Sequence, residues 1–187
     1  FRTVKNNVLV QDPLNTNFYE ERGQVTSQGF EMDITGNLTN NFIINANYTY
    51  TDARITKDAV AENVGFPNYG VANHTGNAMI RYRFLSGSLN GFSAGVGVQL
   101  MGRRAAVWPG WTDVHDKNVT APAYTLLDAN VGYDRDKFSI RANVFNLTNR
   151  QGMDNATWNS ATDAMPGFFT FSPLQPINFR VMASYKF

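Results

Sequence analysis

The two histidines of the chain, His74 and His115, are the side chains best suited to metal or proton chemistry. His115 lies between Asp113 and Asp116, and imidazole and carboxylate groups are ordinary ligands of transition metals. Three such ligands in one loop, without further residues that orient them, rarely fix a coordination geometry. We therefore expect a solvated cluster here, and neither a resident metal ion nor another cofactor.

Catalysis by a nucleophile or by paired acids finds little support in the sequence. The chain contains no cysteine. No serine, histidine and acid stand together at strand ends, and no pair of carboxylates is isolated in apolar surroundings. Gly95-x-Gly97 lacks the following helix that a dinucleotide-binding turn requires. We predict that the protein is not an enzyme.

The composition excludes further classes of protein. Sixteen basic and fifteen acidic residues give a net charge of +1, so no electrostatic footprint indicates nucleic acid. No segment approaches the roughly 18 apolar residues that a membrane-spanning helix needs. Aromatic residues make up 13% of the chain, and apolar stripes of helical period are missing. This combination is typical of an antiparallel β protein.

Apolar and polar residues alternate along several segments, as they do in strands with one wet face. The clearest case is 42–51, where Phe42, Ile44 and Ala46 oppose Asn45 and Asn47. Together with the opening segment, the pattern predicts about eight strands, at 1–10, 30–35, 42–51, 77–84, 92–99, 127–133, 138–144 and 180–187.

The connections between these strands alternate in length. Short turns are expected at 36–41, 85–91 and 134–137, where Gly, Asn, Asp and Ser favour tight turns. Connections of roughly 20 to 30 residues are expected at 52–76, 103–125 and 149–178, which is unusual inside a compact soluble domain. Short turns on one rim and long loops on the other are typical of an outer-membrane barrel.

Bulky rings flank the short turns on the apolar face, and the strand centres there are small or aliphatic. The rings are Phe42, Phe84, Phe92, Tyr133, Phe138 and Phe187, and the small centres include Ala46, Ala94, Ala129, Ala142 and Ala183. An aromatic girdle at the lipid headgroups predicts this arrangement. A β-sandwich would instead need large residues at mid-strand to fill its core.

Several charged residues fall on the opposite, polar face. In a barrel that face lines the lumen, where charges could guide a ligand or hold an internal domain through charged hydrogen bonds. They could equally be solvated by a wet interior. The candidates are Glu31, Asp33, Arg81, Arg83, Asp128, Arg141 and Arg180.

Three segments carry a family resemblance. The ending Val181-Met-Ala-Ser-Tyr-Lys-Phe187 resembles the C-terminal strand of outer-membrane proteins, in which Tyr185 and Phe187 would form the signal that the barrel-assembly machinery reads. Gly29-Phe30-Glu31-Met32-Asp33 with Ala46-Asn47-Tyr48-Thr49-Tyr50-Thr51-Asp52-Ala53, and Asn143-Val-Phe-Asn-Leu-Thr-Asn149, resemble the late barrel of TonB-dependent siderophore receptors.

The resemblance implies that residues 1–187 are the C-terminal part of a 22-stranded, plugged barrel in the bacterial outer membrane. It also implies import of an iron–siderophore or similar chelate. The partners would be outer-membrane lipid, the ferric chelate, the barrel-assembly machinery and the TonB complex. The plug and the TonB box would lie in an N-terminal part that this chain lacks. A self-contained eight-stranded barrel and a secreted carbohydrate-binding sandwich are the alternatives.

Aromatic and cationic residues in the long loops would then be the ligand contacts. Loop tips are normally polar, so tryptophans there either pack onto neighbouring loops or present a binding surface. Aromatic faces and cations would suit an anionic chelate. The candidates are Tyr69, His74, Arg103, Arg104, Trp108, Trp111 and Trp158.

Overall fold

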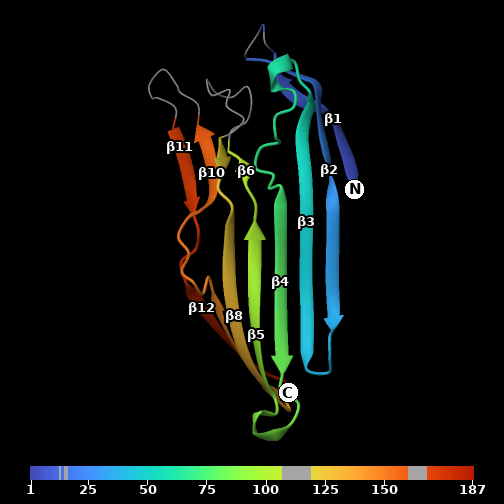
Figure 1. Cartoon of the computed structure of the whole chain (residues 1–187). Coiled ribbons are helices and arrows are strands. Elements are labelled where there is room, and N and C mark those ends of the chain that lie inside the picture. Colours follow the sequence, from blue (N-terminus) through green and yellow to red (C-terminus); the bar gives the residue numbers. More distant parts are fainter. Residues whose placement is uncertain (13, 15–16, 107–118, 160–167) are drawn as a thin grey trace.

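The chain forms one open antiparallel sheet of eight long strands in the computed structural model, which describes residues 1–12, 14, 17–106, 119–159 and 168–187. Each long strand pairs with the next long strand along the chain (Figure 1). The strands are β1 (Arg2–Gln11), β2 (Tyr19–Asn37), β3 (Phe42–Lys57), β4 (His74–Arg83), β5 (Phe92–Met101), β8 (Tyr124–Arg135), β9 (Phe138–Phe145) and β12 (Asn178–Tyr185).

Smaller elements occupy the connections. β6 (Arg104–Ala105) pairs with β7 (Thr120–Ala121), and β10 (Met153–Asn159) pairs with β11 (Phe168–Pro173). These two hairpins lie at the end of the sheet opposite the short turns and the C-terminus (Figure 1). Two 3-10 turns, η1 (Ala61–Asn63) and η2 (Gly87–Leu89), complete the set. In the described ranges, no helix has the length and apolar character needed to cross a membrane.

The predicted all-β fold and its eight strands are confirmed, and two features differ from the prediction. β2 begins at Tyr19 and β3 continues to Lys57, so both strands extend well past the predicted ranges. The connections expected at 103–125 and 149–178 also contain the β6–β7 and β10–β11 hairpins. Both differences lie at the long-connection end of the sheet, where the alternation of apolar and polar residues changes.

One face of the sheet is apolar from β2 to β12. Directly paired residues share a face, and pairing connects Ile44 to Ile80 and onward to the far edge. The resulting row is Ile44, Ile80, Val96, Ala129, Val144 and Phe179. Rings pair at the short-turn end of this face, with centroids 4.8 Å apart for Phe42 and Tyr82 and 4.6 Å apart for Phe92 and Tyr133.

This apolar face is open. Val96 and Val181 are 59% and 60% exposed, and no second sheet packs over them in the part of the chain that the structure describes. A sandwich would bury these side chains, whereas a lipid-facing wall leaves them accessible. β1 and β12 form the two edges of the sheet and do not pair with each other, so the described strands do not close into an eight-stranded barrel.

The faces exchange character within β3. From Phe42 to Tyr50 the apolar side chains point outward, a length that matches the roughly 9–11 residues of a membrane-crossing strand. Beyond Tyr50 the outward positions are polar, at Asp52 and Arg54, while the inward Ala53 and Ile55 are buried. The inversion marks the level at which lipid gives way to water.

Substitution of Ala46 and Asn47 tests which face meets lipid. Ala46→Arg places a charge midway along the apolar band and should destabilise the barrel by about 2–4 kcal/mol, whereas Asn47→Arg points to the polar face and should cost much less. The measurement is unfolding of the intact barrel in phospholipid by urea. Equal effects would mean that the two faces are assigned wrongly.

Candidate functional site

The buried core of the described chain lies at the long-connection end of the sheet, where the sequence predicts ligand contacts. We call it the rim core. Its side chains come from the top of β3, from the 58–73 connection, from the start of β8, and from the two small hairpins and the residues next to them. They are Ala53, Ile55, Phe66, Ala72, Ala105, Ala106, Ala121, Tyr124, Ala156 and Leu174. The described parts of the long connections are therefore packed against one another.

Backbone hydrogen bonds fasten the 58–73 connection to its neighbours. Ile55 N–H donates to the Phe66 carbonyl at 3.0 Å, and Asn68 N–H donates to the Ala53 carbonyl at 2.8 Å. Further along, Tyr69 bridges to Ala105. The connection thus runs beside the upper end of β3 and reaches β6, and these bonds pair several of its backbone groups.

Arg104 ties three rim elements together. Its guanidinium donates to the Asp154 backbone carbonyl and lies 3.7 Å from Asp154 Oδ1, while the Tyr124 hydroxyl donates to the same Oδ1 at 2.6 Å. The guanidinium carbon also lies 5.6 Å from the centre of the Tyr124 ring. A buried cation is stable only when it is paired, and here the partners come from two other strands. The cluster therefore joins β6, β8 and β10.

The structure separates the candidate ligand contacts. Tyr69 is half-buried, Arg103 is exposed, and both lie at the rim beside buried Arg104. His74 lies apart on the apolar face, opposite Tyr50 in the pairing register. Its Nδ1 is 2.7 Å from the Tyr48 hydroxyl, and its ring centre is 5.2 Å from that of Tyr50.

The structure describes the position of one of the three candidate tryptophans. Trp158 lies in β10, where it pairs with Phe169 of β11. Trp108 and Trp111 lie outside the described residues, as do Asp113, His115 and Asp116. In the ranges that the structure describes, no group of three or more His, Asp or Glu residues could hold a metal ion.

The register places all the charged candidates of the polar face on one side of the sheet, which we call the inner face. Glu31 and Asp33 lie on β2. The basic ones lie on β4, β9 and β12, and Asp128 lies between them on β8. One row across this face is Arg81, Gly95, Asn130, Asn143 and Arg180.

Three arginines surround a floor of small residues at the short-turn end of the inner face. Arg81 and Arg83 on β4 lie across from Ser93 and Gly95 on β5, and Arg141 lies beyond on β9. The Nε atoms of Arg81 and Arg83 are buried and have no hydrogen-bond partner in the described part of the chain. We call this group the arginine basin.

Gly132 allows Arg141 to lie across the basin. A Cβ on Gly132 would come within 2.6 Å of an Arg141 guanidinium nitrogen and 2.9 Å of Ser93 Oγ. Arg141 is also held by Asp134, whose Oδ2 is 2.8 Å away. Because residue 132 is a glycine, the Arg141 guanidinium can occupy the space that a side chain at position 132 would take.

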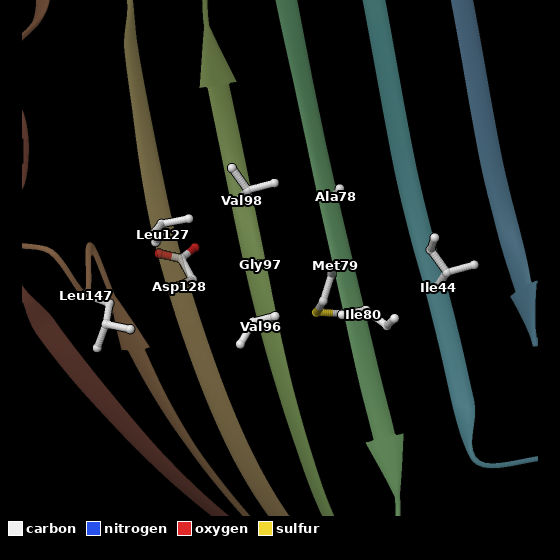
Figure 2. Close-up of a pocket in the computed structure, with 10 residues that line it drawn as sticks. All are labelled: Ile44, Ala78, Met79, Ile80, Val96, Gly97, Val98, Leu127, Asp128 and Leu147. Atoms are coloured by element: carbon white, nitrogen blue, oxygen red, sulfur yellow. The ribbon is translucent and has the colours of Figure 1, made fainter. Parts of the chain in front are cut away.

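Cavities lie against both faces of the central strands. On the inner face, a cavity of about 280 Å³ is lined mainly by carboxamide and small residues of β3, β4, β5, β8 and β9. A second, apolar cavity of about 400 Å³ lies among Ile44, Ala78, Val96, Val98 and Leu127. Figure 2 shows these apolar side chains on the neighbouring strands β3, β4, β5 and β8, with Leu147 at one margin.

Sequence reasoning missed two residues that hold several elements together. Asp154 is the partner of both Arg104 and Tyr124, and Asn146 is 2% exposed and fully hydrogen-bonded. Asn146 has a left-handed backbone with φ of 51°. The only sign of this in the sequence is that the segment is rich in asparagine, which tolerates that conformation.

Comparisons with known proteins agree on one family. Residues 1–147 match the family model described as TonB dependent receptor-like, beta-barrel. The chain is 35% identical over 154 residues to a metal-pseudopaline receptor of Pseudomonas aeruginosa, covering 81% of this chain and 20% of that protein. It is 30% identical over 156 residues to a ferrioxamine B receptor of Salmonella typhimurium, covering 81% of this chain and 21% of that protein. The chain thus spans about one fifth of these curated relatives.

Solved structures show the same fold. The closed form of the ferric-catecholate import receptor Fiu from E. coli superposes with a TM-score of 0.74 and 21% identity, covering 100% of this chain and 24% of that one. The siderophore receptor PiuA from Acinetobacter baumannii gives a TM-score of 0.74 and 20% identity, covering 97% and 24%.

Adjacent arginines should behave differently on substitution. Arg104→Ala removes the cation that Asp154 and Tyr124 share, and because the Asp154 side chain is 54% exposed, the rim should lose about 1–2 kcal/mol of local stability. Arg103→Ala removes an exposed side chain and should change stability by less than about 0.5 kcal/mol. Amide exchange in β6, β7 and β10 measures both. Equal protection in the two variants would contradict the role given to Arg104.

Proposed function

The chain belongs to the TonB-dependent receptor β-barrel family of the bacterial outer membrane, and we propose that it is part of a receptor that imports a metal chelate, foremost an iron–siderophore complex. The observation that carries the proposal is the pairing of a lipid-type outer face with a polar inner face, in a chain whose relatives are named for chelates. Import in such a protein is transport, so the proposal includes no enzymatic step.

The proposed arrangement divides the receptor in two. Residues 1–187 form the C-terminal part of the barrel domain, and the remaining polypeptide supplies the other strands, the plug and the TonB box. A barrel of 22 strands leaves a lumen wide enough to hold a plug. Outer-membrane lipid, the barrel-assembly machinery acting on Tyr185 and Phe187, and the TonB complex are the proposed partners.

Ligand capture is proposed for the rim. The 58–73 connection, which contains Tyr69, lies beside the segment that contains Arg103. Arg103 is exposed and offers a cation to an anionic chelate. Arg104 supports the rim instead of reaching the ligand, because its charge is shared with Asp154 and Tyr124. Trp108, Trp111 and Trp158 remain proposed contacts on sequence grounds. His74 is proposed as a residue of the outer aromatic girdle, because it faces outward with Tyr48 and Tyr50.

The inner face is proposed to contact the plug. Buried arginine Nε atoms without partners are costly, and a carboxylate or carbonyl from another part of the receptor would satisfy them. The arginine basin lies at the short-turn end, away from the rim, which favours a resident partner over an incoming ligand. Glu31, Asp33, Asp128 and Arg180 extend the same surface.

Uptake by the intact receptor tests the proposed function. Cells that express it as their sole receptor of this class should accumulate radioactive iron from ferrioxamine B, or metal from its pseudopaline complex, in a saturable manner. Uptake should stop when TonB is deleted or its energy source is removed. Uptake that is unsaturable and independent of TonB would indicate a passive pore.

The arginine basin gives a second prediction. In the intact receptor, Arg81→Gln with Arg83→Gln should destabilise the plug relative to the barrel, because charge-assisted hydrogen bonds contribute about 1.5–3 kcal/mol each. Urea unfolding followed by a probe in the plug should shift to lower concentration, while the barrel transition stays. Lys137→Gln, in an exposed turn, is the control. An unchanged plug transition would leave these arginines as solvated wall residues.

A further inference from the structure

The turn after β9 has an unusual backbone. Asn146 and Asn149 have φ angles of 51° and 48°, in the left-handed region that asparagine tolerates better than most residues. Asn149 N–H donates to the Asn146 carbonyl at 2.8 Å, which closes the turn. The Asn146 side chain is thereby directed into the protein, and the residue is 2% exposed.

A single carboxamide holds both ends of the β10–β11 hairpin. Asn146 Nδ2 donates to the Arg150 carbonyl at 3.0 Å and to the Gln175 carbonyl at 2.8 Å, and its Oδ1 accepts from Arg150 N–H at 2.8 Å. Arg150 leads into β10, and Gln175 follows β11. Asn149 adds a further bond, since its Oδ1 accepts from Ile177 N–H at 3.0 Å.

The same turn is fixed to the barrel wall. Asn146 N–H donates to Asp128 Oδ1 at 2.9 Å, and Leu147 N–H donates to the Leu127 carbonyl at 2.6 Å. Both acceptors belong to β8. Asp128 belongs to the inner face, and with Asn146 and Gln175 it lines an inner-face cavity of about 220 Å³. The turn therefore connects the base of the hairpin to the wall of the polar interior.

We propose that Asn146 is the positioning residue of the β10–β11 hairpin: its buried carboxamide clamps the two ends of the hairpin to each other, and its backbone holds them against Asp128. Few side chains fit this position. Aspartate lacks the two N–H donors, glutamine is one methylene longer, and glycine fits the backbone but makes no bonds. The consequence for ligand capture rests on the proposed function, because the hairpin carries Trp158.

The test uses the intact receptor with three variants. Asn146→Gly keeps the left-handed backbone and removes the carboxamide, and Asn146→Asp keeps the acceptor and removes both donors. Thr148→Ala, at an exposed position in the same turn, is the matched control. Amide exchange should become about tenfold faster or more in β10 and β11 of both Asn146 variants, while β8 and β9 exchange as before. The control should match the wild type.

Two outcomes would overturn the proposal. Unchanged exchange in β10 and β11 would mean that the carboxamide does not hold the hairpin, and equal loosening of β8 and β9 would mean that Asn146 stabilises the wall in general.

Binding of ferrioxamine B and of the pseudopaline–metal complex supplies a separate readout. A positioning role predicts weaker binding of whichever chelate the wild-type receptor takes, with an unchanged amount of folded receptor in the membrane. Wild-type receptor that binds neither chelate would count against the proposed function, and the exchange experiment would still decide the role of Asn146.

Discussion

Backbone hydrogen bonding in lipid is the constraint on which the rest of this structure depends. A peptide group in hydrocarbon has no water to bond, so each strand must be paired along its whole membrane-crossing length. The ladders from β3 to β9 run without a register shift, and the β2–β3 ladder shifts only at Gln24/Val25, beyond the apolar band. With the backbone satisfied in this way, side chains alternate strictly between lipid and interior, and the row from Ile44 to Phe179 follows.

This constraint applies only within the lipid, and the structure changes at the level where the strands reach water. In β3 the outward residues become polar at Asp52, and the inward Ala53 and Ile55 become buried. Above that level apolar side chains no longer gain by facing outward, so they pack against the 58–73 connection and the small hairpins. Among the residues that the structure describes, the ordinary buried core therefore lies at the rim, beyond the exposed apolar wall.

The strands and faces that lipid controls could be predicted from the sequence, and most contacts at the rim could not. Alternation from Phe42 to Tyr50 identified the strand and its faces, since lipid imposes the pattern residue by residue. The β10–β11 hairpin was missed because Met153–Asn159 does not alternate. Arg103 and Arg104 look equivalent in the sequence, and the fold alone brings Asp154 to one of them. His74 was predicted in a loop, and the register with Tyr50 places it on the apolar face.

The two faces of one strand are therefore under different physical demands. An outward position accepts only side chains that lipid tolerates, whereas an inward position meets water or protein and accepts any group with a partner. Gly132, Ser93 and Arg141 illustrate the second case, since a glycine here makes room for a guanidinium from the next strand. Chemical variety, and with it the proposed contacts with a ligand and a plug, is concentrated on the inner face and the rim, because there the barrel wall leaves side chains free to differ.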